Sequence, residues 1–298
     1  MYNFVILCVI VLLGTSYSSV EGAPRIIGGI AASEKQFLYM VSLQLLSEVD
    51  LETRGHRCGG ALITYSHALT AASCLYYQNN QGIFIEIFTR EYRLFAGSER
   101  LDNDDASRIR SISNFTMHPE FDPRQPYIND IAIITTSEAF PTNVVTPLNL
   151  PVGDVTVNNP SNCQSPGWGG QDSSASASYH LMYTESYVTE NGACSRFYSK
   201  EGTMIDMQPS MLCAVPYMHT SGCQGDIGNP LVCNNDITGI LFLSKTCSSP
   251  IETSNPDVYT SVFSYKAWIE ETTNGASTYQ LGIGLLAMLA LVQIVIST

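Results

Sequence analysis

Basic residues are scarce in this sequence. Its 298 residues include 14 Lys and Arg against 27 Asp and Glu, which gives a formal net charge of -13. Proteins that bind nucleic acid need a basic surface to displace the counterions of the phosphate backbone. This balance excludes nucleic acid as an expected partner and predicts a solvated acidic surface. Charged residues make up only 14% and apolar residues 45%, so the chain can bury a sizeable core and is not expected to be disordered.

Close groups of metal-ligating residues are also missing. The sequence has no C-x-x-C pair and no His-x3-His partner, so we expect no zinc site, no other metal and no cofactor. With Cys8 set aside in an apparent leader, the remaining cysteines are Cys58, Cys74, Cys163, Cys194, Cys213, Cys223, Cys233 and Cys247. An even set in an exported chain predicts four disulfide bonds, whose pairing counting alone leaves open.

Helical periodicity is nearly absent, and internal repeats and blocks of like charge are missing. Instead, short runs rich in β-branched and aromatic residues are separated by Gly, Pro, Asn and Asp, as in residues 92–98, 131–136 and 230–243. This pattern predicts an all-β antiparallel sandwich or barrel. One short helix is predicted from Ser264, its N-cap, to about Glu271.

Both ends carry apolar runs that lack basic flanks. Residues 4–13 and the small residues after them predict a signal peptide over residues 1–18, followed by a short propeptide over residues 19–25. Residues 273–298 form a small polar linker and an apolar tail, barely long enough to cross a bilayer core of about 30 Å. Asn274 is a candidate GPI attachment residue. A GPI anchor, a retained membrane helix and a secreted protein with neither remain open.

These end segments predict the secretory pathway, with an extracellular and cell-surface anchored product whose tail is its membrane partner. Asn114, in the sequence Asn-Phe-Thr, is the single glycosylation sequon.

A series of motifs between the two ends occurs in a familiar order and spacing. They include RIIGG at residues 25–29, LTAASC at 69–74, NDIAII at 129–134, GWGG at 167–170 and GCQGDIGNPLVC at 222–233. Over residues 26–272 the chain resembles the trypsin/chymotrypsin-like serine proteases, the peptidase S1 family. The resemblance implies two six-stranded antiparallel β-barrels with the active site between them. It also implies the disulfides Cys58–Cys74, Cys163–Cys233, Cys194–Cys213 and Cys223–Cys247.

The resemblance places altered residues at the catalytic positions. Active members use a serine nucleophile, a histidine base and a buried aspartate that orients the histidine. Here Ser73 stands at the histidine position and Ile227 at the nucleophile position, while Asp130 is retained. The amides of Gly225 and Ile227 remain as the remnant of an oxyanion hole, and Asn229 stands where the family has glycine.

The altered triad leaves Asp130 in need of a hydrogen-bond donor. In the family, a serine at the position of Phe242 is a further donor. Ser73 or a water is expected to donate instead, because an unpaired buried carboxylate is costly. The alternative is that Asp130 is open to solvent. We expect the five remaining histidines to be structural or surface residues.

The resemblance also identifies a specificity pocket and an activation switch. Ser221, Ser244 and Asp257 fall at pocket positions, and either ligand recognition or a filled remnant is consistent with them. Cleavage of the Arg25–Ile26 bond by a trypsin-like protease would free an α-ammonium that pairs with Asp226.

The sequence thus predicts a catalytically inactive homologue that binds an extracellular protein or peptide, as a regulator, decoy or scaffold. The alternative is a weak or atypical serine endopeptidase that uses a relocated residue.

Overall fold

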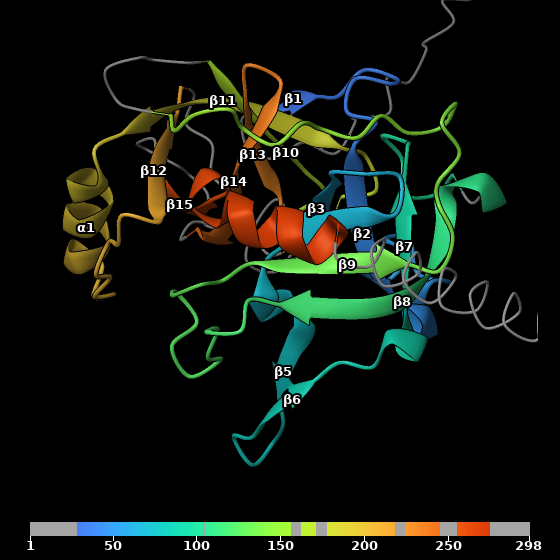
Figure 1. Ribbon diagram of the computed structural model, residues 1–298, viewed down its shortest axis with the longest axis horizontal. Coiled ribbons are helices and arrows are strands. Elements are labelled where there is room, and N and C mark those ends of the chain that lie inside the picture. The colour runs from blue at the N-terminus through green and yellow to red at the C-terminus, as the bar shows by residue number, and fades with distance from the viewer. Residues whose placement is uncertain are drawn as a thin grey trace, which may run out of the picture.

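A computed structural model describes residues 29–103, 105–155, 162–170, 178–217, 225–244 and 255–274 (Figure 1). The regular secondary structure within these ranges is mostly strand. Two closed antiparallel barrels of six strands each lie side by side, which confirms the predicted fold class. Within the described ranges, no helix is long and apolar enough to cross a membrane.

The first barrel has the strand order β2-β3-β4-β9-β8-β7. It closes where β7 pairs with β2, with Ala96 opposite Val41. Its interior is filled by buried aliphatic and aromatic side chains, among them Leu43, Leu62 and Leu94. The strands are β2 (Met40–Leu45), β3 (His56–Leu62), β4 (His67–Thr70), β7 (Tyr92–Ala96), β8 (Ile109–Met117) and β9 (Ala132–Thr136).

The second barrel has the order β11-β10-β13-β14-β15-β12 and closes through pairing of β11 with β12. The short strand β1 (Ile30–Ala31) adds to the outer side of β11. The strands are β10 (Cys163–Gly167), β11 (Met182–Thr189), β12 (Met211–Pro216), β13 (Pro230–Cys233), β14 (Asp236–Leu243) and β15 (Asp257–Ser261).

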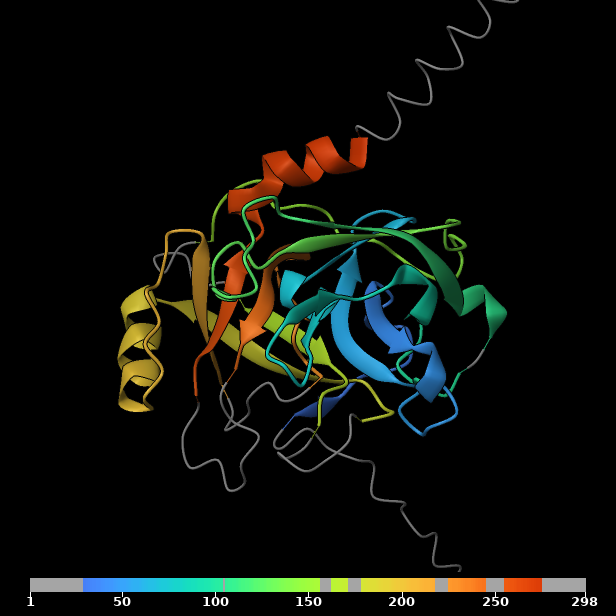
Figure 2. The ribbon, with the colours of Figure 1, turned by 90° about the horizontal axis from the view of Figure 1, so that it is seen from below.

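Two helices of the described ranges lie outside the barrels (Figure 2). The C-terminal helix spans residues 266–274 and follows a 3-10 turn, η5 (Phe263–Tyr265). The helix therefore begins two residues later than predicted. The strand that precedes it, which starts at Asp257, ends at Ser261. The helix α1 (Asn191–Lys200) is an element that the sequence pattern did not predict.

A two-stranded hairpin, β5 (Tyr76–Gln78) with β6 (Phe84–Glu86), projects away from both barrels. It follows directly on the 3-10 turn η2 (Ala72–Leu75), which carries Ser73. Short 3-10 turns complete the structure at η1 (Leu46–Glu48), η3 (Thr89–Glu91) and η4 (Ala106–Arg108).

Candidate active site

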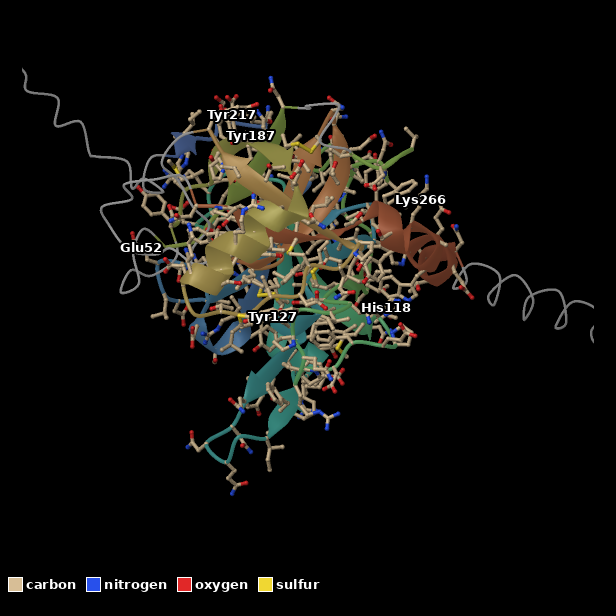
Figure 3. The ribbon with its side chains drawn as sticks, turned by 90° about the vertical axis from the view of Figure 1, so that its left-hand side faces the viewer. Glu52, His118, Tyr127, Tyr187, Tyr217 and Lys266 are labelled. Atoms are coloured by element: carbon tan, nitrogen blue, oxygen red, sulfur yellow. A yellow bond between two sulfur atoms is a disulfide. The ribbon has the colours of Figure 1, made fainter. Side chains whose placement is uncertain are left out.

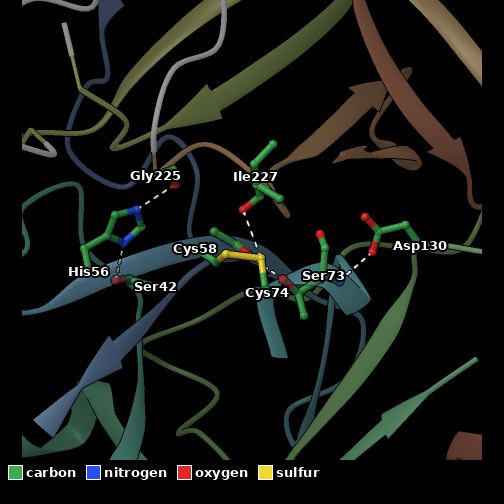
Figure 4. Close-up of a disulfide and its surroundings, with 10 residues drawn as sticks. Ser42, His56, Cys58, Ser73, Cys74, Asp130, Gly225 and Ile227 are labelled. Atoms are coloured by element: carbon green, nitrogen blue, oxygen red, sulfur yellow. Dashed lines mark hydrogen bonds between the residues drawn. A yellow bond between two sulfur atoms is a disulfide. The ribbon is translucent and has the colours of Figure 1, made fainter. Parts of the chain in front are cut away.

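Ser73, Asp130 and Ile227 come together between the barrels (Figure 4). Ser73 lies in η2, just after β4, and Asp130 lies two residues before β9. Both therefore belong to the first barrel. Ile227 lies in the turn that leads into β13 of the second barrel. The structure thus juxtaposes the three residues that the resemblance assigns to the degenerate triad.

Asp130 is buried, with 1% of its surface exposed. Its Oδ1 accepts a hydrogen bond of 2.7 Å from the backbone N–H of Ser73, and the Ser73 side chain also hydrogen-bonds the carboxyl, so the predicted donor is confirmed. Burial raises the pKa of Asp130 to about 7, and hydrogen bonds from Ser73 and Ala72 partly oppose that rise. The alternative of a solvent-accessible Asp130 is wrong. The hydroxyl of Thr260, on β15, donates to the Asp130 carbonyl at 2.8 Å and fixes this backbone from the second barrel.

Ile227 is held by both barrels. Its carbonyl accepts a hydrogen bond of 3.0 Å from the backbone N–H of Gly59, on β3. Its side chain is partly buried and packs against core side chains of the first barrel and of the second. The Cys58–Cys74 disulfide lies beside it, with Cys74 Sγ 3.6 Å from the Ile227 carbonyl oxygen. An aliphatic side chain therefore occupies the point where the two cores meet.

The turn around Ile227 requires glycine on one side. Gly228 has a φ of 89°, and a Cβ there would come 2.4 Å from the Gly59 carbonyl oxygen and from Thr70 Oγ1. The hydroxyl of Thr70 also donates to that same carbonyl at 2.7 Å. The close approach of β3 and β4 thus sets the path of the chain past Ile227.

Asp226 has a donor that the family pattern would not supply. Asn229 Nδ2 donates to Asp226 Oδ1 at 2.7 Å, and Gly169 N donates to the same oxygen at 2.8 Å. Asp226 and Asn229 are 3% and 1% exposed. A Cβ at Gly59 would lie 1.5 Å from Asn229 Oδ1, so the amide occupies space that only glycine leaves. The departure from glycine at residue 229 was visible in the sequence, but its partner was not.

His56 is one of the histidines expected to be structural or surface residues, and the structure gives it partners at this site that the sequence did not indicate. Its Nε2 donates to the Gly225 carbonyl at 2.8 Å, and its Nδ1 accepts from Ser42 Oγ at 2.7 Å. Burial lowers its pKa to about 4, so the imidazole is neutral. Within the described chain, its ring lies edge-on to Trp168 and bonds the turn at Gly225, while the donors to Asp130 come from Ser73 and Ala72. His56 thus positions the turn that carries the oxyanion-hole remnant.

The specificity pocket is described only in part. Asp257 is 2% exposed at the start of β15, where its backbone pairs with Ala214. Burial raises the pKa of the neighbouring Tyr198, and the charge of Asp257 adds to that rise. Ser244 is half-buried at the end of β14, and Phe242 is buried with its ring 6.1 Å from that of Tyr127. Ser221 lies outside the described residues.

Some of the remaining predicted positions are described by the structure, and others lie outside the described residues. Three disulfides are confirmed: Cys58–Cys74, Cys163–Cys233 and Cys194–Cys213. Asn114 is exposed on β8, with its amide donating to Thr116 Oγ1 at 3.1 Å, and Asn274 is exposed at the end of the C-terminal helix. Arg25, Ile26, Cys223 and Cys247, together with the apolar runs at both ends, lie outside the described residues.

Chemically, this centre offers a carboxyl that titrates near neutral pH beside a serine. An isoleucine side chain cannot attack a carbonyl, and Ser73 lacks an imidazole partner within the described chain. The carboxyl of Asp130 is closer in pKa to a general base than its ordinary value suggests. Its burial limits this role, because a base must be within hydrogen-bond reach of the proton that it takes.

Comparison with known proteins agrees with the fold. The family model described as Trypsin matches residues 26–269. Human azurocidin is 30% identical over 88% of this chain and 92% of its own length. Trypsin zeta of Drosophila melanogaster is 27% identical over 84% of this chain and 86% of its own length. Renal glandular kallikrein of Mastomys natalensis is 26% identical over 90% of this chain and 97% of its own length. The chain therefore belongs to the trypsin family of serine proteases.

Proposed function

We propose that this chain is a non-catalytic member of its family that acts by binding an extracellular protein or peptide. The observation that carries the proposal is the residue set at the centre: Ile227 packs into both barrels where a nucleophile would stand, and Ser73 meets Asp130 through a backbone amide. In serine proteases such as subtilisin, loss of the nucleophile or base costs roughly 10⁶ in turnover. The binding task is that of a regulator, decoy or scaffold in a protease cascade or in surface recognition.

Exposed apolar residues near this centre support a binding role. Three apolar side chains in the β5–β6 hairpin and just after it are exposed to solvent: Tyr77 by 50%, Ile83 by 54% and Phe88 by 47%. Apolar and aromatic side chains gathered on a projecting element are typical of protein-binding surfaces. The hairpin follows directly on the turn that carries Ser73, so a partner bound at its base would lie beside that turn.

An active-serine phosphonate probe tests the lack of catalysis. The purified domain should remain unlabelled, whereas the double variant Ser73→His/Ile227→Ser restores the missing groups and tests whether the cleft is competent. The matched control is Ser73→Ala/Ile227→Ala, which changes the same positions without adding a nucleophile. Labelling of the wild-type domain would contradict the proposal.

One observation favours the alternative of a weak or atypical endopeptidase. The raised pKa of Asp130 makes it a better base toward the Ser73 hydroxyl than a carboxylate of ordinary pKa. If this alternative holds, the wild-type domain reacts with the probe and Ser73→Ala abolishes the reaction. Loss of labelling in Ser73→Ala thus distinguishes a relocated nucleophile from a contaminant.

We further propose that cleavage of Arg25–Ile26 by a trypsin-like protease orders the loops beside Asp226. The buried carboxylate supports a receiving site for a new α-ammonium, although desolvation offsets much of such a pair. Because Asn229 already donates to Asp226, Asn229→Gly should increase the gain in loop protection on cleavage. Hydrogen exchange of cleaved and intact protein measures it, and unchanged protection in both proteins would contradict the switch.

The location outside the cell is part of this proposal. Three described disulfides support an oxidising compartment, and the apolar ends support export and a surface anchor. Release of the protein from cells by a GPI-specific phospholipase would support the GPI form, and retention would favour a membrane helix. Affinity capture with cleaved and intact protein side by side identifies the partner.

A further inference from the structure

A cavity of about 300 Å³ lies between the second barrel and the segment that leads into β2. One wall is the segment that leads into β2, with Phe37 and Tyr39. The other is formed by β10, β11 and the tight turn Asn234–Asn235 between β13 and β14. It shares no lining residue with the centre around Ser73, Asp130 and Ile227. Its volume is at the small end of the roughly 300–1,000 Å³ range of small-molecule sites.

The rim of this cavity is built from side-chain amides. Gln36, Asn162, Gln164, Asn234 and Asn235 line it, from three separate stretches of chain. In two of them a hydrogen bond orients the side-chain amide oxygen: Gln36 Oε1 accepts from Ser33 N at 2.9 Å, and Asn162 Oδ1 accepts from Tyr217 Oη at 3.3 Å. The opposite arm of each is an NH₂ group, which donates two hydrogen bonds. The rim therefore presents both donors and acceptors.

The floor and the neighbouring surface are apolar and aromatic. Phe37, Tyr39 and Val232 are 6%, 8% and 7% exposed and line the cavity together with Cys163 of the Cys163–Cys233 disulfide. Next to Asn162, Tyr217 is 52% exposed and its ring lies 5.1 Å from that of Tyr187. Figure 3 shows the two tyrosines together at one edge of the second barrel. Flat aromatic faces beside the rim provide a surface for an apolar ligand face.

The charge of the lining selects among ligands. Glu185 is the one carboxylate, and Lys, Arg and His are absent from the lining residues. A phosphate or carboxylate ligand therefore finds no cationic partner here and meets Glu185 instead. A sugar ring fits this chemistry, since it has C–H faces for aromatic contact and hydroxyls that both donate and accept. Burial raises the pKa of Tyr39, so its hydroxyl remains a neutral donor.

We propose that this cavity is a binding site for one neutral sugar residue, either free or at the end of a glycan. The amides of Asn162 and Gln164 pair with its hydroxyls, and Glu185 accepts from a third. The site is independent of the degenerate catalytic centre, so it holds whether or not that centre is active.

Ligand-observed NMR and calorimetry on the full domain test the site. The probes are methyl α-D-mannoside, methyl β-D-galactoside and N-acetylglucosamine, with glucuronate as the charged counterpart and an asparagine-linked high-mannose glycopeptide as the glycan-borne form. We expect saturable binding of at least one neutral probe with a Kd on the order of 1 mM, and weaker binding of glucuronate. Binding of the glycopeptide as well as the glycosides assigns a glycan end, and binding of the glycosides alone assigns a free sugar.

The variant Asn162→Leu/Gln164→Met removes two amides while keeping side-chain size. It should weaken binding at least roughly tenfold, because hydroxyls left without partners lose affinity. The matched control is Asn80→Leu/Gln81→Met, which makes the same changes at the exposed tip of the β5–β6 hairpin and should bind like the wild type. Lack of saturable binding up to about 20 mM of every neutral probe, or equal affinity in wild type and variant, would overturn the proposal.

Discussion

At the scale of single residues, this centre keeps two buried ionisable groups whose pKa values move in opposite directions. Burial raises the pKa of the Asp130 carboxyl to about 7 and lowers that of the His56 imidazole to about 4. In both cases the neutral form is favoured, because a charge loses its hydration inside the protein. Each shift makes stability depend on pH, and the two dependences have opposite signs.

Asp130 should destabilise the folded protein as pH rises. Its folded pKa of about 7 lies above the ordinary 3.8, so between these values the folded state holds a proton that the unfolded state has lost. The cost grows through this window to the order of 4 kcal/mol and is constant above pH 7. Asp130→Asn should therefore be more stable than the wild type at pH 8 and similar at pH 4, as measured by urea unfolding.

The control for this change is Asp154→Asn, which removes an exposed carboxylate. Its difference from the wild type should stay within about 0.5 kcal/mol at both pH values. A wild-type protein as stable as Asp130→Asn at pH 8 would show that the carboxylate is compensated in the folded state.

His56 should act in the other direction. Its folded pKa of about 4 lies below the ordinary 6.5, so its stabilisation is complete above pH 6.5 and is lost as pH falls toward 4, by about 3 kcal/mol. His56→Gln removes the titrating ring. Unfolding curves at pH 7 and pH 4.5 should show that the advantage of the wild type over His56→Gln shrinks in acid. The control is His180→Gln, which makes the same substitution at a half-buried histidine. A constant difference for His56→Gln would rule out the neutral buried imidazole.

At the scale of elements, the strands were predictable and helix α1 was not. Residues 230–243 were predicted as one β-rich run, and the structure divides this run into β13 and β14 at Asn234–Asn235, both with positive φ. Helix α1 contains Gly192 and residues of modest helix propensity, so local preference does not specify it. Its buried positions are Cys194 and Tyr198, one turn apart, and the Cys194–Cys213 disulfide ties it to β12. Tertiary contacts therefore decide this element.

Removal of that disulfide should loosen α1 before the barrels. The bond closes a loop of sequence separation 19, for which a loop-entropy estimate gives roughly 3 kcal/mol. Cys194→Ala/Cys213→Ala should lower the free energy of unfolding by about that amount and reduce amide protection in α1 more than in β9. Hydrogen exchange resolves the two elements. Equal loss of protection in both would contradict a local role of the bond.

At the scale of the whole molecule, the site was predictable as a set of positions but not as a set of contacts. The motif order placed Ser73, Asp130 and Ile227 in one cleft because each motif sits at a fixed point of the double barrel. The roles of His56 and Asn229 depend on partners 169 and 3 residues away, and a single sequence does not reveal those contacts. The His56–Gly225 bond joins the two halves of the molecule, and two further bonds do the same: Thr260 donates to the Asp130 carbonyl, and Tyr265 donates to Asn129 at 2.8 Å.

Ile227 should therefore stabilise both barrels at once. Its side chain packs on core residues of each barrel, and its carbonyl bonds Gly59. Ile227→Ala should lower the free energy of unfolding by about 1–3 kcal/mol, at the low end for a large-to-small core change because the side chain is only partly buried. Urea unfolding measures the total, and hydrogen exchange should show reduced protection in β3 and in β13 together. The control Ile128→Ala, at a side chain 39% exposed, should stay within about 0.5 kcal/mol of the wild type. Loss of protection in the second barrel alone would mean that Ile227 fills a local gap and does not join the two cores.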